Sequence, residues 1–216
     1  MGHVSAEGPS GASILAVVGL RREARIIDRR ARVVVGAAGL DAALAQDAEG
    51  IISFGLCGGL DPKLAVGDLV IGDGVITRSG RLATDPAWAA RLAAILGSAT
   101  RTDFAASNAV IDSAKAKSAL RAETGAGAVD MESHFVAEAA MRRAIPFVIL
   151  RAVSDPADRT LPPSALAGFR PDGASDILAV LSALVASPFE LPARIRTALD
   201  AGRAYRSLER AALAAL

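Results

Sequence analysis

The sequence predicts an α/β fold, a single-domain three-layer α/β/α sandwich around a mixed, mostly parallel central sheet. Short apolar runs rich in β-branched residues alternate along the chain with segments of helical periodicity, which is typical of this class. The run Phe147–Val153 is apolar except for Arg151, as in a strand that helices cover on both faces. Hydrophobic residues make up 52% of the chain and aromatic residues only 4%, which suits helices packed closely on a sheet.

Strands are expected where a β-branched run lies between turn residues. The first, Ser13–Leu20, is expected at the centre of the sheet. A short strand should end at Val129, and further strands are expected at Val33–Val35, Gly50–Phe54, Leu69–Ile76 and Phe147–Val153. Helices are expected from near Arg22, at Leu40–Gln46, at Trp88–Leu96, at Ala114–Glu123, and between Glu132 and Arg143.

The two ends and one long loop complete the chain. Residues 1–12 are expected to form a flexible N-terminal tail, and residues 13–216 a single domain. The stretch Asp155–Gly173 has four prolines and no periodicity, so we interpret it as a lid or binding loop. A long basic amphipathic helix should begin at about residue 188. We expect it to pack on the domain with a solvated outer face; contact with a membrane surface is the alternative.

Charge and residue usage exclude several kinds of partner. The net charge of +1 gives no case for nucleic acid. The single cysteine, Cys57, excludes an internal disulfide, and with only His3 and His134 beside it no metal site or cofactor is expected. Cys57 should be a packing residue, and His134 a satisfied or subunit-facing histidine. No apolar run approaches the ~20 residues that span a bilayer, so a cytoplasmic protein is expected.

Three carboxylates follow strand ends in the predicted fold. Glu132 and Asp155 each come just past a strand, and Glu23 follows the first strand. Taken singly, the glutamates suit the first turn of a helix and Asp155 suits a turn with Pro156. In open α/β sheets, however, ligands bind beyond the carboxyl ends of the strands. The joint placement of the three therefore predicts a site at this rim.

A glycine-rich stretch, Gly55-Leu56-Cys57-Gly58-Gly59, follows the buried strand that begins at Gly50. Three glycines in five residues allow the backbone to pass close to a ligand and to direct N–H groups at it. The spacing does not match the dinucleotide-binding fingerprint. We therefore expect a tight turn beside the site rather than a nucleotide-phosphate loop.

Four motifs occur in the order of one known family. They are Gly19-Leu20-Arg21-Arg22-Glu23-Ala24, Ser53–Gly59 followed by Val66-Gly67-Asp68, Val129-Asp130-Met131-Glu132-Ser133, and Arg151-Ala152-Val153-Ser154-Asp155. The chain from about Ile14 to Asp158 thereby resembles the nucleoside phosphorylase and nucleosidase superfamily. Four stretches are similar to the hopanoid-associated branch, whose members remove adenine from adenosylhopane: Gly19–Ala24, Ser53–Pro62, Val129–His134 and Asp155–Pro163.

This resemblance implies roles for particular residues. Asp155 would be the general acid that protonates or hydrogen-bonds N7 of adenine. Glu132, with Met131 beside it, would hold the ribose hydroxyls, and Glu23 would orient or deprotonate an attacking water. The family pattern also places Ser154, Gly55 and Phe54 at the ribose or the base. To hold a proton at neutral pH, Asp155 would need a pKa above its ordinary value of ~3.9.

The acceptor of the ribosyl group stays open. Phosphorolytic relatives carry an Arg-x-Gly-Ser pattern where this chain has Ser53-Phe54-Gly55-Leu56, so both usual phosphate ligands are missing. Arg21 and Arg22 are the candidate phosphate ligands in their place. The residues favour water, whereas the branch is commonly called a phosphorylase.

Three functions remain in competition. The first is an enzyme, an N-ribosyl hydrolase or phosphorylase, that releases adenine from an adenosylhopane-like nucleoside in hopanoid biosynthesis. The second is a soluble methylthioadenosine/S-adenosylhomocysteine nucleosidase or a purine nucleoside phosphorylase. The third is a catalytically silent nucleoside-binding module. The resemblance also implies a homo-oligomer, for which we expect a dimer, and the lipid substrate would require peripheral contact with the inner membrane surface.

Overall fold

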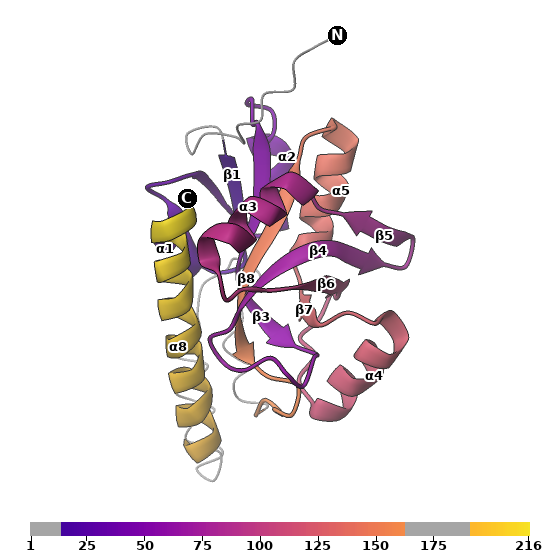
Figure 1. Cartoon of the computed structure of the whole chain (residues 1–216), viewed down its shortest axis with the longest axis vertical. Helices are drawn as coiled ribbons and strands as arrows, with labels where there is room; N and C mark the ends of the chain where they lie inside the picture. Colours follow the sequence, from indigo (N-terminus) through magenta and orange to yellow (C-terminus); the bar gives the residue numbers. More distant parts are fainter. Residues whose placement is uncertain (1–13, 163–190) are drawn as a thin grey trace.

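The computed structural model describes residues 14–162 and 191–216, and it shows an eight-stranded sheet flanked by helices (Figure 1). The strands are β1 (Ile14–Val18), β2 (Arg32–Val35), β3 (Gly50–Gly59), β4 (Leu69–Thr77), β5 (Gly80–Ala83), β6 (Thr100–Ala106), β7 (Ala128–Asp130) and β8 (Phe147–Asp155). The helices are α1 (Arg21–Ile27), the 3-10 helix η2 (Ala37–Gly39), α2 (Leu40–Ala43), α3 (Pro86–Leu96), α4 (Ala114–Thr124), α5 (Ser133–Arg143) and α8 (Leu191–Ala215). The expected tail at residues 1–12 and residues 163–173 of the expected loop lie outside the described residues.

The sheet is mixed and mostly parallel, as predicted. Strands β2, β1, β3 and β8 run parallel to their neighbours, and β4 lies antiparallel to β8. Strand β6 is parallel to β4 and β7 is parallel to β6, and β7 then pairs antiparallel with the end of β3. Strands β3, β8, β4, β6 and β7 therefore close into a ring, with β1 and β2 extending from it.

The placement of the first strand at the centre of the sheet was wrong. Strand β1 lies between β2 and β3, one position from the edge. The centre belongs to β3, because its ten residues are long enough to pair with β1, β8 and β7.

Helices cover both faces of the sheet, and alternate residues of each strand point to opposite layers. On β1, Ile14, Ala16 and Val18 join a core with side chains of α1, α3 and α8. Leu15 and Val17 join a second core with side chains of α2 and α5. Figure 1 shows α8 and α5 on opposite sides of the sheet. The three-layer arrangement predicted from the sequence is confirmed.

Several element predictions need correction. Strands β5 and β6 were not predicted, because β5 is a mostly exposed hairpin arm and β6, with the sequence TRTDFAA, carries polar residues at its start. The glycine-rich stretch is not a turn: β3 continues through it to Gly59, pairing with β8 and shifting register between Cys57 and Gly58. The helix expected at Leu40–Gln46 ends at Ala43 and follows the 3-10 helix η2.

The C-terminal helix α8 is present and packs mainly on β8 and on helices α3 and α1. Its buried face includes Ala204, Leu208 and Ala211, whereas Ile195 and Leu213 are exposed. Among the helices of the described ranges, none has both the length and the apolar character required to cross a membrane.

Candidate active site

A cavity of about 480 Å³ opens where β3, β7 and β8 meet the segment that follows β1. Its polar lining includes Glu23, Asp130, Glu132, Arg151, Ser154 and Asp155. Its apolar lining includes Leu20, Leu56, Val110, Ile111, Val129, Met131 and Phe135. The three carboxylates that the sequence placed just past strand ends therefore share one cavity, a few residues from the ends of β1, β7 and β8.

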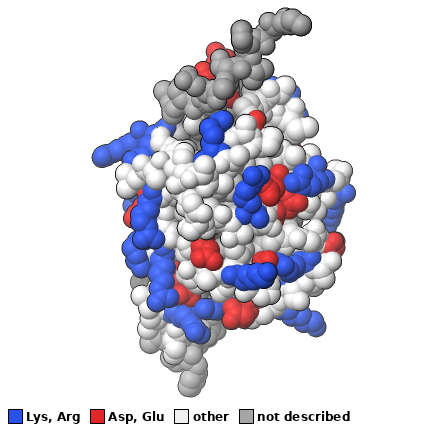
Figure 2. Space-filling view, in the orientation of Figure 1, with Lys and Arg blue, Asp and Glu red and all other residues white. Residues whose placement is uncertain are grey.

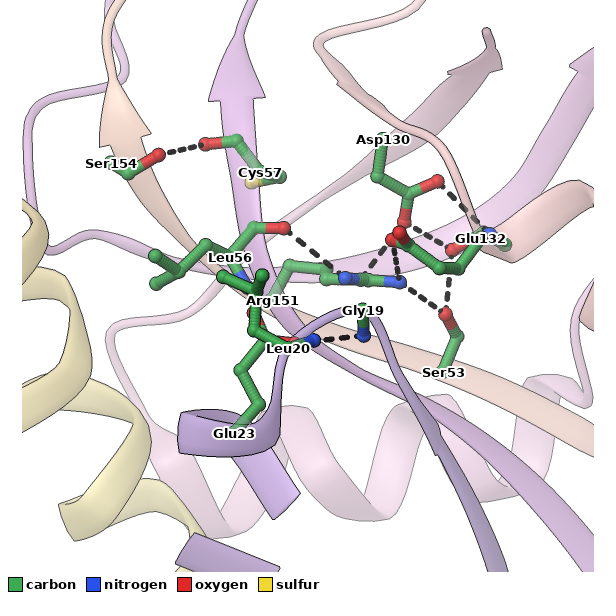
Figure 3. A network of polar contacts seen from close by, with 11 residues as sticks. Gly19, Leu20, Glu23, Ser53, Leu56, Cys57, Asp130, Glu132, Arg151 and Ser154 are labelled. Carbon is green, nitrogen blue, oxygen red and sulfur yellow. Dashed lines mark hydrogen bonds and ion pairs between the residues drawn. The ribbon is translucent and has the colours of Figure 1, made fainter. Parts of the chain in front are cut away.

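Arg151 is fully buried and contacts several polar groups of the site (Figure 3). Its Nε lies 2.8 Å from Oδ2 of Asp130, and its Nη2 lies 3.1 Å from Oε2 of Glu132. It also donates to Oγ of Ser53 and to the carbonyl oxygen of Leu56. Burial lowers the pKa of Arg151, but the surrounding carboxylates outweigh burial and raise that pKa above its ordinary value. The guanidinium is thus a permanent positive charge at the floor of the cavity.

A chain of hydroxyl groups supports this arginine. Ser133, the first residue of α5, donates its hydroxyl hydrogen to Oδ2 of Asp130, and its backbone N–H donates to Oδ1 at 3.0 Å. The hydroxyl of Ser53 lies 2.9 Å from that of Ser133 and accepts from Arg151 at 2.7 Å. Because Ser133 gives its hydrogen to Asp130, Ser53 must donate to Ser133, and both hydroxyl hydrogens therefore have an acceptor.

Glu23 is held by the backbone around it. Its Oε2 accepts N–H groups from Gly19 and Leu20, and its Oε1 accepts one from Leu56, each at 2.8 Å. Burial raises the pKa of Glu23 to about 7, although Arg151 and the backbone N–H groups oppose the rise. A carboxyl group with this pKa can both take up and release a proton at neutral pH.

Two glycines permit the close approach of the glutamates. At Gly55, where φ is +151°, a Cβ atom would lie 2.5 Å from the carboxyl carbon of Glu23. At Gly19 a Cβ atom would lie 2.6 Å from Oε1 of Glu132. Contacts this short cannot be accommodated without moving the carboxyl groups, so the site depends on glycine at both positions.

Asp155, the last residue of β8, lies opposite a buried lysine. Its Oδ2 is 2.7 Å from Nζ of Lys117 on α4, and its Oδ1 accepts the Ser154 hydroxyl at 2.7 Å. Burial raises the pKa of Asp155 above its ordinary value, while Lys117 and Ser154 oppose the rise. A raised pKa is what a carboxyl group needs in order to act as a proton donor at neutral pH. Burial likewise raises the pKa of Glu132, against the effect of Arg151.

The structure brings together most, but not all, of the residues that the sequence suggested. Glu23, Met131, Glu132, Ser154 and Asp155 line the cavity, and Gly55 lies behind Glu23. The structure does not place Phe54 there, because its side chain points into the core shared with α3 and α8.

The two candidate phosphate ligands do not line the cavity either. The guanidinium of Arg22 lies 4.1 Å from the ring centre of Tyr205 on α8, and Arg22 borders a different, arginine-rich groove between α1 and α8. Arg21 is exposed on α1 and is not among the described residues that line the cavity. The side chains of Arg21 and Arg22 are exposed on the surface of α1, whereas that of Glu23 is buried.

Sequence reasoning assigned no site role to Arg151, Asp130 or Lys117. Arg151 was the one charged residue in an otherwise apolar strand, and that was a usable signal because a fully buried charge requires partners.

Cys57 is a buried packing residue, as expected, with a thiol pKa raised by burial. His134 is buried as well, but its Nδ1 has no hydrogen-bond partner among the described residues. Those residues contain no group of three or more His, Cys, Asp or Glu side chains that could hold a metal ion.

Comparison with known proteins places the fold. Residues 31–186 match the family model described as Phosphorylase superfamily. No curated protein matches the chain.

Solved structures share the architecture at low sequence identity. A 5′-methylthioadenosine/S-adenosyl homocysteine nucleosidase of Helicobacter pylori superposes with a TM-score of 0.61 at 17% identity, over 84% of this chain and 100% of that one. The futalosine hydrolase of Helicobacter pylori gives 0.61 at 17% identity, over 82% and 98%. An S-adenosylhomocysteine nucleosidase from Streptococcus pyogenes gives 0.62 at 16% identity, over 97% and 99%. At these identities the likeness is one of fold.

Proposed function

This chain belongs to the phosphorylase superfamily, a family of enzymes, and we propose that it cleaves the N-ribosidic bond of an adenine nucleoside with a large apolar 5′ substituent. One observation carries the proposal: the carboxyl groups of Glu23, Glu132 and Asp155 line a single cavity around the buried Arg151. The cavity therefore offers a proton donor, ligands for hydroxyl groups and a base.

The chemistry of the bond calls for this set of groups. When the bond between C1′ and N9 breaks, its electron pair moves into the purine and the ribosyl group becomes positively charged, as in other glycoside cleavages. Asp155 would give its proton to N7 of the leaving adenine. Glu132 would accept the ribose hydroxyls beside Met131, and its charge would stabilise the developing cation. The raised pKa of Asp155 supports its assignment as the acid.

Glu23 would activate the acceptor. A water molecule adds its oxygen to C1′, and Glu23 takes the proton that the water releases. Three backbone N–H groups hold the carboxylate in place: Oε2 accepts two of them and Oε1 accepts one, so Oε1 keeps a lone pair for the water. A base with a pKa of about 7 is well matched to neutral pH.

We propose water rather than phosphate as the acceptor. Among the described lining residues, Arg151 is the only arginine, and its charge is already opposed by Asp130 and Glu132. A phosphate dianion would also lie near Glu23 and Glu132, and like charges in a partly buried site repel strongly.

The 5′ substituent is inferred from the apolar lining. Ala37, Val110, Ile111 and Phe135 line the cavity without offering side-chain hydrogen bonds. Apolar walls of this kind suit a hydrocarbon group. Together with the sequence resemblance around Asp155–Pro163, they favour an adenosylhopane-like substrate and a place in hopanoid biosynthesis.

A small-molecule nucleosidase is the second candidate. The solved structures of similar fold include nucleosidases for 5′-methylthioadenosine and S-adenosylhomocysteine, whose substrates share the adenine and ribose groups. Comparable turnover of methylthioadenosine and of adenosylhopane would favour this candidate. A clear preference for the lipid nucleoside would favour the first.

Contact with a membrane surface would suit a lipid-linked substrate, and we propose it for the outer face of α8. Ile195, Leu199 and Leu213 are 52%, 60% and 70% exposed on this face. Arginines lie between them and in the neighbouring groove, which is bordered by Arg22, Arg25, Arg29 and Arg30. Figure 2 shows a line of basic side chains along the edge of the molecule where α8 runs. Exposed aliphatic groups among arginines match an anionic lipid surface.

We also propose a homodimer formed through α5. Phe135 and Met141 on this helix are 39% and 61% exposed, and contact with a second copy would remove these apolar side chains from water. Light scattering across a range of protein concentrations, with Met141→Glu as the comparison, tests this assembly.

The experiment that tests the proposed function is the Asp155→Asn substitution. An asparagine keeps the size of the side chain and one acceptor oxygen but has no acidic proton to give. We expect adenine release to fall by about a hundredfold or more, within the range for general acids, while nucleoside binding changes little. Unchanged turnover would reject the assignment of the acid. Binding without turnover in the native protein would instead indicate a silent binding module.

A further inference from the structure

Lys117 is a fully buried lysine whose ammonium group contacts one short segment of the chain. Its Nζ lies 2.7 Å from Oδ2 of Asp155. It also donates to the backbone carbonyl oxygens of Asp155, Pro156 and Arg159, at 3.0, 2.9 and 3.2 Å. A buried ammonium is costly unless a carboxylate and other acceptors surround it. The end of β8 and the residues that follow it therefore surround this one charge with acceptor oxygens.

The same segment is tied to the rest of the protein on two sides. The backbone N–H of Leu161 donates to the carbonyl oxygen of Asp112, just before α4, at 2.7 Å. Nη1 of Arg159 lies 2.6 Å from Oδ2 of Asp200 on α8. Lys117 contacts the same segment from Asp155 to Arg159, next to these two connections, so its ammonium helps to fix the position of Asp155.

The two oxygen atoms of Asp155 have different surroundings. Oδ2 contacts Lys117, whereas Oδ1 accepts the hydroxyl of Ser154 at 2.7 Å. That hydroxyl has a second acceptor in reach, the carbonyl oxygen of Cys57 at 3.3 Å. If Ser154 turns to Cys57, Oδ1 can carry a proton while Oδ2 stays beside the ammonium. Oδ1 is then the oxygen that serves a ligand.

We propose that Lys117 is a positioning residue for Asp155: its ammonium fixes Oδ2 and the following backbone, leaves Oδ1 for proton transfer, and balances the carboxylate formed when the proton leaves. This inference rests on the proposed function. In the step itself, the proton on Oδ1 passes to N7 as the C1′–N9 electron pair enters the purine. Asp155 becomes a carboxylate, and Lys117 keeps all its protons.

Burial and Lys117 act on Asp155 in opposite directions. Charged or titratable groups around Asp155 come from three elements: Lys117 on α4, Cys57 on β3, and Arg159 in the segment after β8. Burial raises the pKa of the acid, and Lys117 is the largest influence that lowers it. Without the ammonium, the acid would hold its proton more tightly and give it up less readily at a given pH.

The test is the pH dependence of adenine release by Lys117→Met, compared with the native protein and with Lys115→Met. Lys115 is an exposed lysine on the same helix and serves as the matched control. We expect Lys117→Met to lower kcat about tenfold near pH 7, to leave KM nearly unchanged, and to move the basic limb of the kcat profile up by about one pH unit. The Lys115→Met profile should match the native one.

Other outcomes separate the possible failures. A folded Lys117→Met protein with the native basic limb would overturn the inference, even if its kcat were low, because a merely structural lysine would not move that limb. If Lys117→Met does not fold, Lys117→Arg is tested in its place. This variant keeps the positive charge, so the basic limb of its kcat profile should lie at the native pH. A shifted basic limb would contradict the proposal. In an Asp155→Asn background, Lys117→Met should have little further effect on kcat. If the native protein releases no adenine from any nucleoside, the proposed function fails and this inference fails with it.

Discussion

Nη2 of Arg151 lies 3.1 Å from Oε2 of Glu132, so a buried residue of β8 directly contacts the carboxylate at the start of α5. The same guanidinium contacts Asp130 at the end of β7. One cation in the middle of β8 thereby holds two carboxylates, one at the end of β7 and one at the start of α5. The position of the proposed ribose ligand depends on a residue that need not touch the substrate.

Arg151→Met should destabilise the protein strongly. The substitution leaves the carboxylates of Asp130 and Glu132 buried without their cation, and breaking a buried pair in this way costs about 3–5 kcal/mol. Urea denaturation measures the loss. Arg142→Met is the control, because Arg142 and its partner Asp41 are 59% and 77% exposed and should contribute little. Equal losses of stability in the two variants would contradict the role of Arg151 in stabilising the buried carboxylates of Asp130 and Glu132.

Gly55→Ala should impair activity more than a positive φ alone explains. The new Cβ would meet the Glu23 carboxyl group at 2.5 Å and displace it. Gly80→Ala is the matched control, since Gly80 also has a positive φ of +125° but nothing within 4 Å. We expect both variants to lose about 1–3 kcal/mol of stability from backbone strain, and only Gly55→Ala to lose kcat by about tenfold or more. Full activity in Gly55→Ala would show that Glu23 tolerates displacement.

Activity should rise with pH through about 7, because Glu23 must be deprotonated to accept a proton from water. The acid limb of the kcat/KM profile reports this ionisation. Glu23→Gln should lose most activity and lack this limb. A native profile that is flat between pH 5 and 8 would contradict the role of Glu23 as the base.

Stability should change with pH through the same group. The folded pKa of Glu23, about 7, lies above its ordinary value of 4.5, so the folded protein binds the proton more tightly than the unfolded chain. The resulting stability is complete below pH 4.5 and is lost as pH rises to about 7. Glu23→Gln lacks this loss, so the difference between the native protein and the variant should shift by up to about 3 kcal/mol between pH 4.5 and 8. Chemical denaturation at several pH values measures it, and parallel curves would contradict the shift.

The membrane proposal predicts salt-sensitive binding to anionic vesicles. The native protein should sediment with phosphatidylglycerol vesicles and much less with phosphatidylcholine vesicles, and binding should weaken as salt rises. Arg206→Gln combined with Leu213→Ser should reduce binding, because both side chains are exposed on α8. Arg142→Gln on α5 is the control. Equal binding by all three proteins, or none by the native one, would reject this surface.

Much of the fold could be predicted from local pattern, because the buried runs of β1, β3, β4 and β8 are apolar enough to stand out. The α/β sandwich and the enzyme class are confirmed at the level of the superfamily. The hopanoid substrate, the membrane contact and the roles of individual residues stay predictions. Strand β6 was missed because the first four of its seven residues are polar, and its pairing with β4 and β7 is set by neighbours distant in the sequence.

The site was predicted only where its residues follow strand ends. Glu23, Glu132 and Asp155 were identified in that way, and all three line the cavity. Lys117 could not be told from Lys115, because which lysine turns inward depends on how α4 lies against the segment after β8. Arg22 was misplaced for a related reason: the residues of α1 alternate between the interior and the surface, and only the packing of α1 against α8 shows that Arg22 lies over Tyr205.

The most direct measurement is adenine release from adenosylhopane and from methylthioadenosine by the native protein, with and without phosphate, with the ribosyl product identified by mass. We predict adenine release that does not depend on phosphate and a ribosyl product with a free hydroxyl at C1′. The reasons are that Glu23 is placed to activate water and that Arg151, the arginine among the described lining residues, is already paired with Glu132. Release that requires phosphate and yields a ribosyl phosphate would contradict hydrolysis. Release of no adenine from either nucleoside would contradict cleavage of the N-ribosidic bond itself.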